Sequence, residues 1–192
     1  MSNRLLQTLS RKNLQRRLQS CWQSHGDILF LLAITVLSTV APHPDNITPI
    51  GALGLFAGAY MSQRRYLLLP VVAALLADLA SVGVYNLLIM VFVYAGHLAA
   101  AWCGRLLVDS HRLLGRLPLG VVAASVSFYL LSNLGNWWVF LPHTAAGLWE
   151  NYVAGLPYLL RTLLGNTLYS LLFFGCYELM KHYQPREQSL VH

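Results

Sequence analysis

Apolar residues occur along the chain in long runs that are separated by short polar stretches. Six such runs can be marked, at 27–41, 50–62, 67–82, 84–104, 118–141 and 155–180. A helix needs about 20 residues to cross the hydrocarbon core of a bilayer, and its backbone polar groups must bond within the helix. The pattern therefore predicts an all-α integral membrane protein, a bundle of six transmembrane helices within residues 27–182.

The first two runs are shorter than a full crossing requires. They form either two crossings or a re-entrant hairpin. Both arrangements return the chain to the same side of the membrane, so the basic residues do not distinguish between them.

The basic residues lie almost entirely on one side of this predicted bundle. Twelve of the 13 Lys and Arg fall in the tail 1–26, the turn 62–66, the connection 105–117 or the stretch after residue 180. The alternate connections contain neither Lys nor Arg; these are 42–49, 82–86 and 142–153. The positive-inside rule makes the basic side cytoplasmic, so we expect both termini inside the cell.

Composition agrees with a membrane location. Hydrophobic residues make up 56% of the 192 and charged residues 10%, against about 25% charged in soluble domains. The formal net charge of +6 does not indicate nucleic-acid binding, because five of the basic residues lie in the tail 1–26, where anionic headgroups would hold them. That cytoplasmic tail is compatible with an interfacial amphipathic helix, and residues 183–192 form a second cytoplasmic tail.

Signatures of enzymes and metal sites are missing from the sequence. It contains no G-x-S-x-G, H-E-x-x-H, P-loop or G-x-G-x-x-G motif. The three cysteines and the histidines show no metal-ligand spacing. We therefore expect no enzymatic activity, no cofactor and no metal, and the chain by itself is not an ATP-driven pump.

Polar residues inside two of the runs recur at helical spacing. The fifth run carries Ser125, Tyr129, Ser132 and Asn136, and the sixth carries Thr162, Asn166 and Ser170. Steps of three and four place side chains along one side of a helix. Because polar groups in a bilayer usually face the bundle or a cavity, both stripes are expected to face inward.

Two charged residues lie inside the runs. Asp78 falls about 17 Å from the cytoplasmic end of the third helix at 1.5 Å per residue, and Arg161 is the one basic residue outside the topological pattern. A charge at such depth costs about 2.5–3.5 kcal/mol. Either Asp78 and Arg161 approach each other or share a ligand, or Arg161 reaches the outer headgroups and Asp78 accepts hydrogen bonds from a helix end.

A kinked polar segment, residues 42–49, precedes the second run; we call it the lip. Thr48 is the expected N-cap and Pro49 the first helical residue. Gly51, Gly54 and Gly58 then follow at steps of three and four. Glycines at this spacing allow another backbone to approach closely, so this face packs either inside the bundle or against another protein.

The stretch 133–152 is rich in aromatic residues on the expected outer side. Its Trp and Tyr residues form either the usual interfacial belt or an aromatic pocket. In the second case Asn133, Asn136 and Glu150 would supply converging polar groups.

Three stretches carry a resemblance to known proteins: "PHPDNITPIGALGLFAGAY" at 42–60, "LLADL" at 75–79, and the segment 133–175, which opens with "NLGNWW". Over residues 28–180 the chain resembles an uncharacterised family of small bacterial integral membrane proteins. That family is similar to the substrate-binding S components of energy-coupling factor vitamin transporters. The first run lacks the Ala-x-x-x-Ala motif that S components usually carry there.

The resemblance implies a six-helix bundle in the bacterial inner membrane with a small-molecule site open to the outside. In S components the solute is a vitamin or its precursor, and a separate membrane subunit with two ATPases drives transport. Carried over by position, the substrate-binding residues would be Asp45, Asn46, Thr48, Asp78, Asn133, Asn136, Trp137 and Arg161.

The expected function is binding and uptake of a small, vitamin-like solute from the outer side. The alternative is an accessory or assembly subunit of a larger membrane complex, with the glycine faces as docking surfaces. The expected partners are the lipid bilayer, the solute and a membrane subunit, either an energising module or a larger complex. Nucleic acid is not expected among them.

Overall fold

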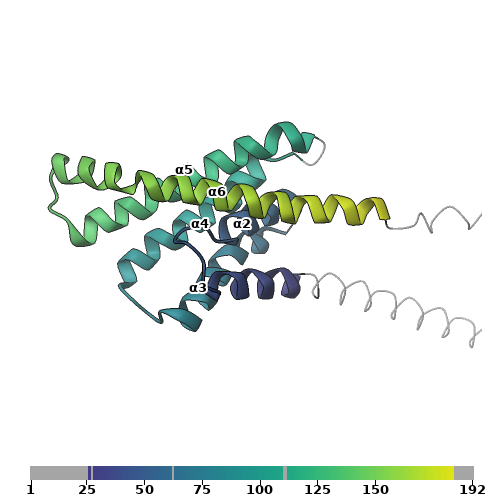
Figure 1. The fold of residues 1–192 in the computed structure, drawn as a ribbon, viewed down its shortest axis with the longest axis horizontal. Coiled ribbons are helices and arrows are strands. Elements are labelled where there is room, and N and C mark those ends of the chain that lie inside the picture. Colours follow the sequence, from purple (N-terminus) through teal and green to yellow (C-terminus); the bar gives the residue numbers. More distant parts are fainter. Residues whose placement is uncertain (1–25, 27, 62, 110–111, 184–192) are drawn as a thin grey trace, which may run out of the picture. The chain divides into compact units, whose positions relative to one another are not determined.

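A computed structural model describes residues 26, 28–61, 63–109 and 112–183. Its elements are the helix Ile28–Val40, α2 (Ile50–Tyr60), the short 3-10 helix η1 (Arg64–Leu68), α3 (Leu69–Ser81), α4 (Leu87–Leu107), α5 (Leu113–Phe140) and α6 (Ala145–Tyr183), drawn in Figure 1. Every regular element in these ranges is helical, which confirms the predicted all-α class. The expected tails 1–26 and 183–192 lie outside the described residues, apart from Gly26 and Tyr183.

Internal contacts divide the chain into two units, residues 1–34 and 35–192. The described part of the first unit is Gly26 and the beginning of the helix Ile28–Val40. The second unit contains α2 to α6, and the candidate site lies entirely within it.

Helix α2 is the core of the second unit. All its residues from Ile50 to Gly58 are buried, and it contacts α3, α4, α5 and α6. Its 11 residues span about 16 Å at 1.5 Å per residue, roughly half of the 30 Å hydrocarbon core. A short helix that is apolar on every side is explained by this position, because each of its faces meets another helix.

Glycines bring α2 and α4 into backbone contact. A Cβ on Gly54 would lie 3.1 Å from the backbone nitrogen of Ala101, and one on Gly58 would overlap the Ala101 carbonyl oxygen. On α4, a Cβ on Gly104 would overlap the backbone of Leu55. The α2 glycines therefore pack within the chain, in the close helix contact that small residues permit.

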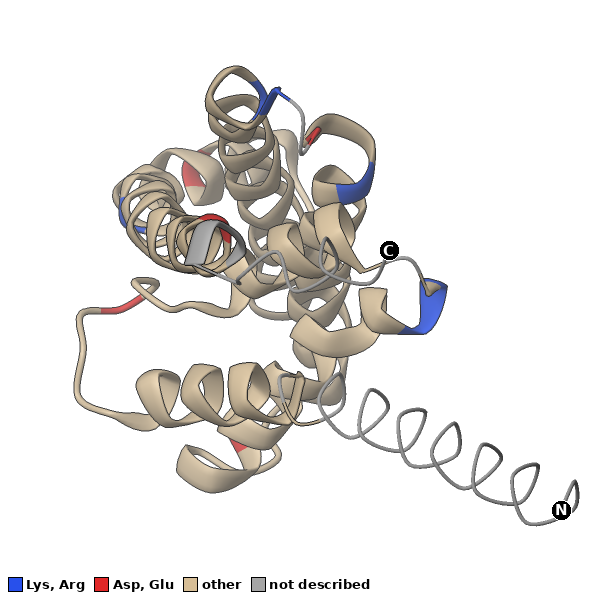
Figure 2. Cartoon of the chain, turned by 90° about the vertical axis from the view of Figure 1, so that its right-hand side faces the viewer, with Lys and Arg blue, Asp and Glu red and all other residues tan. Residues whose placement is uncertain are grey.

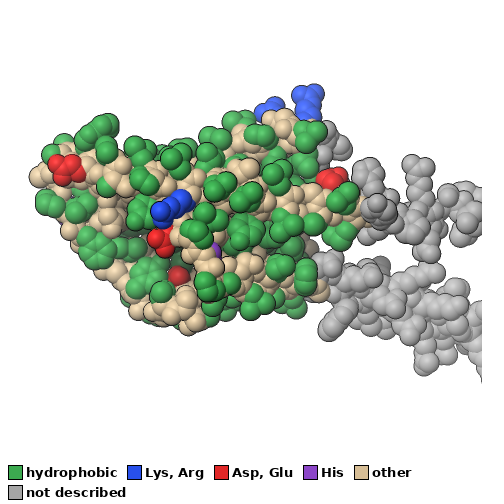
Figure 3. All heavy atoms as spheres, viewed as in Figure 1, with side chains coloured by type: hydrophobic (Ala, Val, Ile, Leu, Met, Phe, Trp, Pro, Cys, Tyr) green, Lys and Arg blue, Asp and Glu red, His purple; other side chains and the backbone are tan. Residues whose placement is uncertain are grey.

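In the described part of the chain, three helices are long and apolar enough to cross a membrane: α4, α5 and the Ala145–Met180 part of α6. Their outward faces carry large apolar side chains, including Leu106, Leu119 and Leu160, at 73%, 47% and 67% exposure. Charged residues are few among the helices (Figure 2), and one face of the molecule is mostly apolar (Figure 3). Helices that are apolar towards both the interior and the surroundings are typical of a membrane protein.

The sixth helix begins earlier than the apolar run that predicted it. Helix α6 starts at Ala145, inside the stretch 142–153 that was expected to be a connection, and it continues through Pro157. Thr144 explains this start, because its hydroxyl accepts a hydrogen bond from the Gly147 amide at 3.0 Å, as an N-cap does. The first turns of α6 contain polar and aromatic residues, so a search for apolar runs did not include them in the predicted helix.

Replacing Gly58 with alanine should destabilise the fold. The new methyl group has no space between α2 and the α4 backbone, and overpacking of this kind costs about 1–3 kcal/mol. Thermal unfolding in detergent measures the effect. Gly175→Ala is the matched control, since nothing lies within 4 Å of a Cβ there, and a helical glycine-to-alanine change should be neutral or stabilising by about 0.5–1 kcal/mol. Equal stability of the two variants would contradict the backbone contact.

Candidate functional site

A partly polar cavity of about 170 Å³ lies where the lip meets α2 to α6. Its polar lining residues are Thr39, Asn46, Thr48, Asp78, His97, Thr162 and Asn166. The remaining lining residues are Ile50, Gly51, Ala100, Ala124 and Phe128. The cavity therefore gathers residues from six helices and the lip, since Thr39 lies on the helix Ile28–Val40. Three of the lining residues, Asn46, Thr48 and Asp78, were predicted site residues.

The lip is held in shape by local hydrogen bonds. The Ile47 amide donates to the Pro44 carbonyl at 3.1 Å, which closes a turn. Asn46 has φ of 64°, a left-handed conformation that Asn tolerates better than most residues. The two His43 ring nitrogens lie 3.0 Å from the Pro44 carbonyl oxygen and 2.7 Å from that of Thr39. Helix α2 begins at Ile50 with Pro49 as its cap, so the expected Thr48 cap is wrong and Thr48 is left for the cavity.

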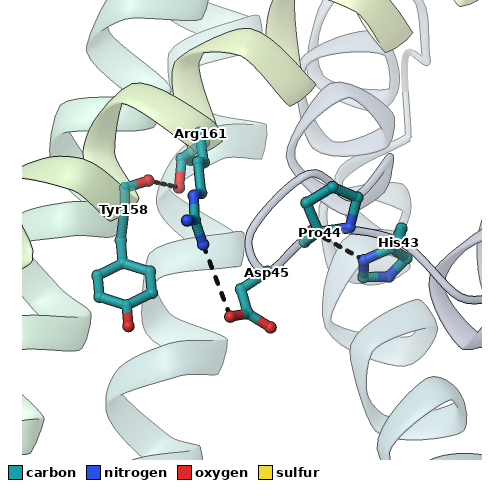
Figure 4. A network of polar contacts seen from close by, with 6 residues as sticks. His43, Pro44, Asp45, Tyr158 and Arg161 are labelled. Atoms are coloured by element: carbon teal, nitrogen blue, oxygen red, sulfur yellow. Dashed lines mark hydrogen bonds and ion pairs between the residues drawn. The ribbon is translucent and has the colours of Figure 1, made fainter.

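Helix α6 contacts the lip through two residues one turn apart, Gly165 and Arg161. A Cβ on Gly165 would lie 3.0 Å from the Ile47 Cα, so the lip backbone rests directly on this glycine. One turn earlier, the Arg161 guanidinium forms an ion pair with Asp45 at 3.6 Å and lies 5.5 Å from the Tyr158 ring centroid (Figure 4). Both members of the ion pair are exposed, Arg161 by 45% and Asp45 by 78%.

Asp78 does not pair with Arg161, so that part of the sequence hypothesis is wrong. Arg161 pairs with Asp45 instead, because the lip places Asp45 beside α6. The Asp78 carboxylate accepts a hydrogen bond from the Tyr94 hydroxyl at 2.8 Å. Burial, followed by the nearby Asp78 carboxylate, raises the pKa of Tyr85 to about 12, which keeps that phenol neutral beside the acid. The Asp78 side chain therefore lies beside two tyrosine hydroxyls, those of Tyr85 and Tyr94, at the cavity.

His97 is one of the cavity residues that sequence reasoning missed. It is 8% exposed and lies on α4, with its ring centroid 4.7 Å from that of Phe128. Within the described part of the chain, neither ring nitrogen has a hydrogen-bond partner, although the residue lines the cavity. The available signal was a lone ionisable residue inside an apolar run, which is costly unless it serves a function.

Asn166 joins the two predicted polar stripes. It is 3% exposed, and its amide nitrogen donates to the Ser125 hydroxyl on α5 at 2.9 Å. A Cβ on Gly51 would overlap the Asn166 side chain, so the α2 glycine makes the space that this amide occupies. The inward-facing stripes were predicted, whereas the place of Asn166 and Thr162 at a cavity was not.

Asn133, Asn136 and Trp137 lie in a separate polar cluster between α5 and α6. The Asn136 amide donates to Asn151 at 2.6 Å, and the Asn151 amide donates to the Asn133 carbonyl at 2.8 Å. The Trp137 indole donates to the Pro142 carbonyl at 3.0 Å. These groups are satisfied within the helical hairpin, and the structure does not place them in the lining of the cavity.

Residues 22–188 match a family of unknown function, DUF6580. The chain belongs to this family. Searches among curated proteins and among solved structures found no match. The DUF6580 match includes every residue that lines the cavity, from Thr39 to Asn166, so the site lies wholly inside the family's shared region.

Replacing Gly165 with leucine should lift the lip from α6. The larger side chain would displace the backbone of Ile47 and Thr48, since even a Cβ on this glycine would lie 3.0 and 3.2 Å from them. Hydrogen exchange of peptides from the stretch 42–49 should then accelerate by about tenfold, since overpacking costs about 1–3 kcal/mol. Gly175→Leu, on the same helix in open space, should leave this exchange unchanged. Equal exchange in both variants would show that the lip does not rest on Gly165.

Proposed function

We propose that the protein binds a small solute in this cavity and takes it up from the outer side of the membrane. The observation that carries the proposal is His97, a buried polar side chain without a partner among the described residues, beside a cavity large enough for a ligand. Its ring nitrogens are not among the fully buried, unpaired side-chain atoms of the described residues, which are the hydroxyl oxygens of Thr35 and Ser170. The His97 imidazole is therefore accessible from the cavity, where a bound solute could pair with it.

The charges of the connections support a position for the lip on the outer side. Five arginines lie at helix ends opposite the lip in the proposed topology: Arg64, Arg65, Arg105, Arg112 and Arg116. By the positive-inside rule those ends are cytoplasmic. We therefore propose a multi-pass protein of the bacterial inner membrane with both termini inside, in which α2 to α6 form the described part of the bundle.

The resemblance to S components supports a vitamin-like solute and a separate energising subunit. We propose that the bundle holds the solute and that another membrane protein supplies the work of transport. The contribution of this chain is then a binding step, with Asp78, His97 and Asn166 as the principal polar contacts.

The alternative is an assembly subunit that docks through its glycines. It was motivated by the glycine face of α2, and this face packs within the chain. Gly54 and Gly58 face the α4 backbone, and Gly51 faces Asn166. These faces are occupied within the chain and are not available for a partner.

Filling the cavity should abolish binding while the fold is kept. Ala124 is fully buried and lines the cavity, so the extra atoms of Ala124→Leu would occupy the space of the solute. Native mass spectrometry should find a retained small molecule on the unaltered protein and none on this variant. In a thermal-shift screen of vitamins and their precursors, the unaltered protein should gain about 2.7 kcal/mol at a hundredfold excess over the dissociation constant.

Val126→Leu is the control, because Val126 lies on the same helix with its side chain 38% exposed. It should bind as the unaltered protein does. A solute that survives Ala124→Leu would place binding elsewhere. If no solute is retained and no vitamin or precursor stabilises the protein, the proposed function is wrong.

A further inference from the structure

The size of the cavity limits the solute. Its volume is about 170 Å³, whereas pockets for drug-sized ligands usually measure about 300–1,000 Å³. An engineered cavity of about 150 Å³ holds one benzene molecule. A single six-membered ring with a short substituent therefore fits.

The charge of the lining favours a cation. Asp78 is the one formally charged residue among the described residues that line the cavity. Arg161 is not in that lining and is already paired with Asp45 at the surface. A carboxylate at this depth is stabilised by a charge of opposite sign, and an anionic solute would be repelled by it.

The polar lining has unused capacity to accept hydrogen bonds. A carboxylate has about four acceptor sites, and the hydroxyls of Tyr94 and Tyr85 take two of those on Asp78. The Asn166 amide donates to Ser125, while its carbonyl oxygen accepts no hydrogen bond from a described residue. A neutral imidazole adds one further acceptor at His97. A solute rich in N–H donors would satisfy all three residues.

An aromatic surface completes the recognition of a cation. The Phe128 ring lines the cavity and packs against the His97 ring. The face of an aromatic ring attracts a cation within about 6 Å of its centroid. The same flat surface also suits a planar ring.

We infer that the solute is a compact cation built on a single ring, whose N–H donors bind Asp78, Asn166 and His97 and whose ring packs on Phe128. This inference rests on the proposed function and names the class of its solute. It applies to residues on α3, α4, α5 and α6 that the cavity brings together.

The charge requirement can be tested with three probes of one size: benzylammonium, benzyl alcohol and benzoate. The unaltered protein is placed in nanodiscs of zwitterionic phosphatidylcholine, with empty nanodiscs as the blank, and binding is measured by saturation-transfer NMR. Benzylammonium should bind about tenfold more tightly than benzyl alcohol, which is the effect of one charge-assisted hydrogen bond. Benzoate should not bind.

Asp78→Asn should lower the affinity for benzylammonium by about tenfold and leave benzyl alcohol unchanged. Glu150→Gln is the matched control, since Glu150 is exposed and outside the cavity lining. The ranking of the probes on the unaltered protein needs no variant, so it stands even if Asp78→Asn fails to fold.

The possible failures are distinguishable. If benzyl alcohol or benzoate binds as tightly as benzylammonium, and Ala124→Leu removes that binding, the cavity is a solute site and the cation inference is overturned. If no probe binds and no solute is retained by the unaltered protein, the inference and the proposed function fall together.

Discussion

The backbone contact between α2 and α4 is the constraint on which the site depends. Gly54 meets Ala100 and Ala101, and further along both helices Gly58 meets Gly104. The contacts advance in the same direction on the two helices, so α2 and α4 run parallel here. One turn before the Gly54 contact, towards the start of each helix, are Gly51 and His97, which both line the cavity. Close packing in the middle of the pair thus fixes the position of the two helix segments that form the site.

Hydroxyl groups in these helices are mostly satisfied by their own backbone. Ser125 donates to the Val121 carbonyl at 2.8 Å, Thr162 to that of Tyr158 at 2.9 Å and Thr39 to that of Thr35 at 2.8 Å. A hydroxyl that bonds four residues back hides its polarity within the helix. In a membrane bundle a stripe of Ser and Thr is therefore weak evidence for a ligand, whereas the Asn166 amide donates to another helix and not to its own backbone.

Local features of the sequence predicted much of this structure, whereas contacts between residues far apart in the sequence were not predicted. Runs of apolar residues located the helices, and glycine spacing indicated a close helix contact. The composition of the lip, and the single acid in the third run, directed attention to Asn46, Thr48 and Asp78, which do line the cavity. The predicted partner of Arg161 was wrong. Asp45 and Asp78 were both candidates, and only the path of the lip determines which of them lies beside Arg161. Nothing in the spacing of the α5 asparagines revealed that Asn151 would bind them.

The contacts between the lip and α6 determine how far salt affects the position of the lip. The Asp45–Arg161 pair is exposed, and such pairs contribute about 0–1 kcal/mol and are screened by salt. The contact at Gly165 involves backbone atoms in van der Waals range and carries no charge. The seat of the lip is therefore steric, and ionic strength has little influence on it. The contact between the lip and α6 should therefore be the same at low and at high salt.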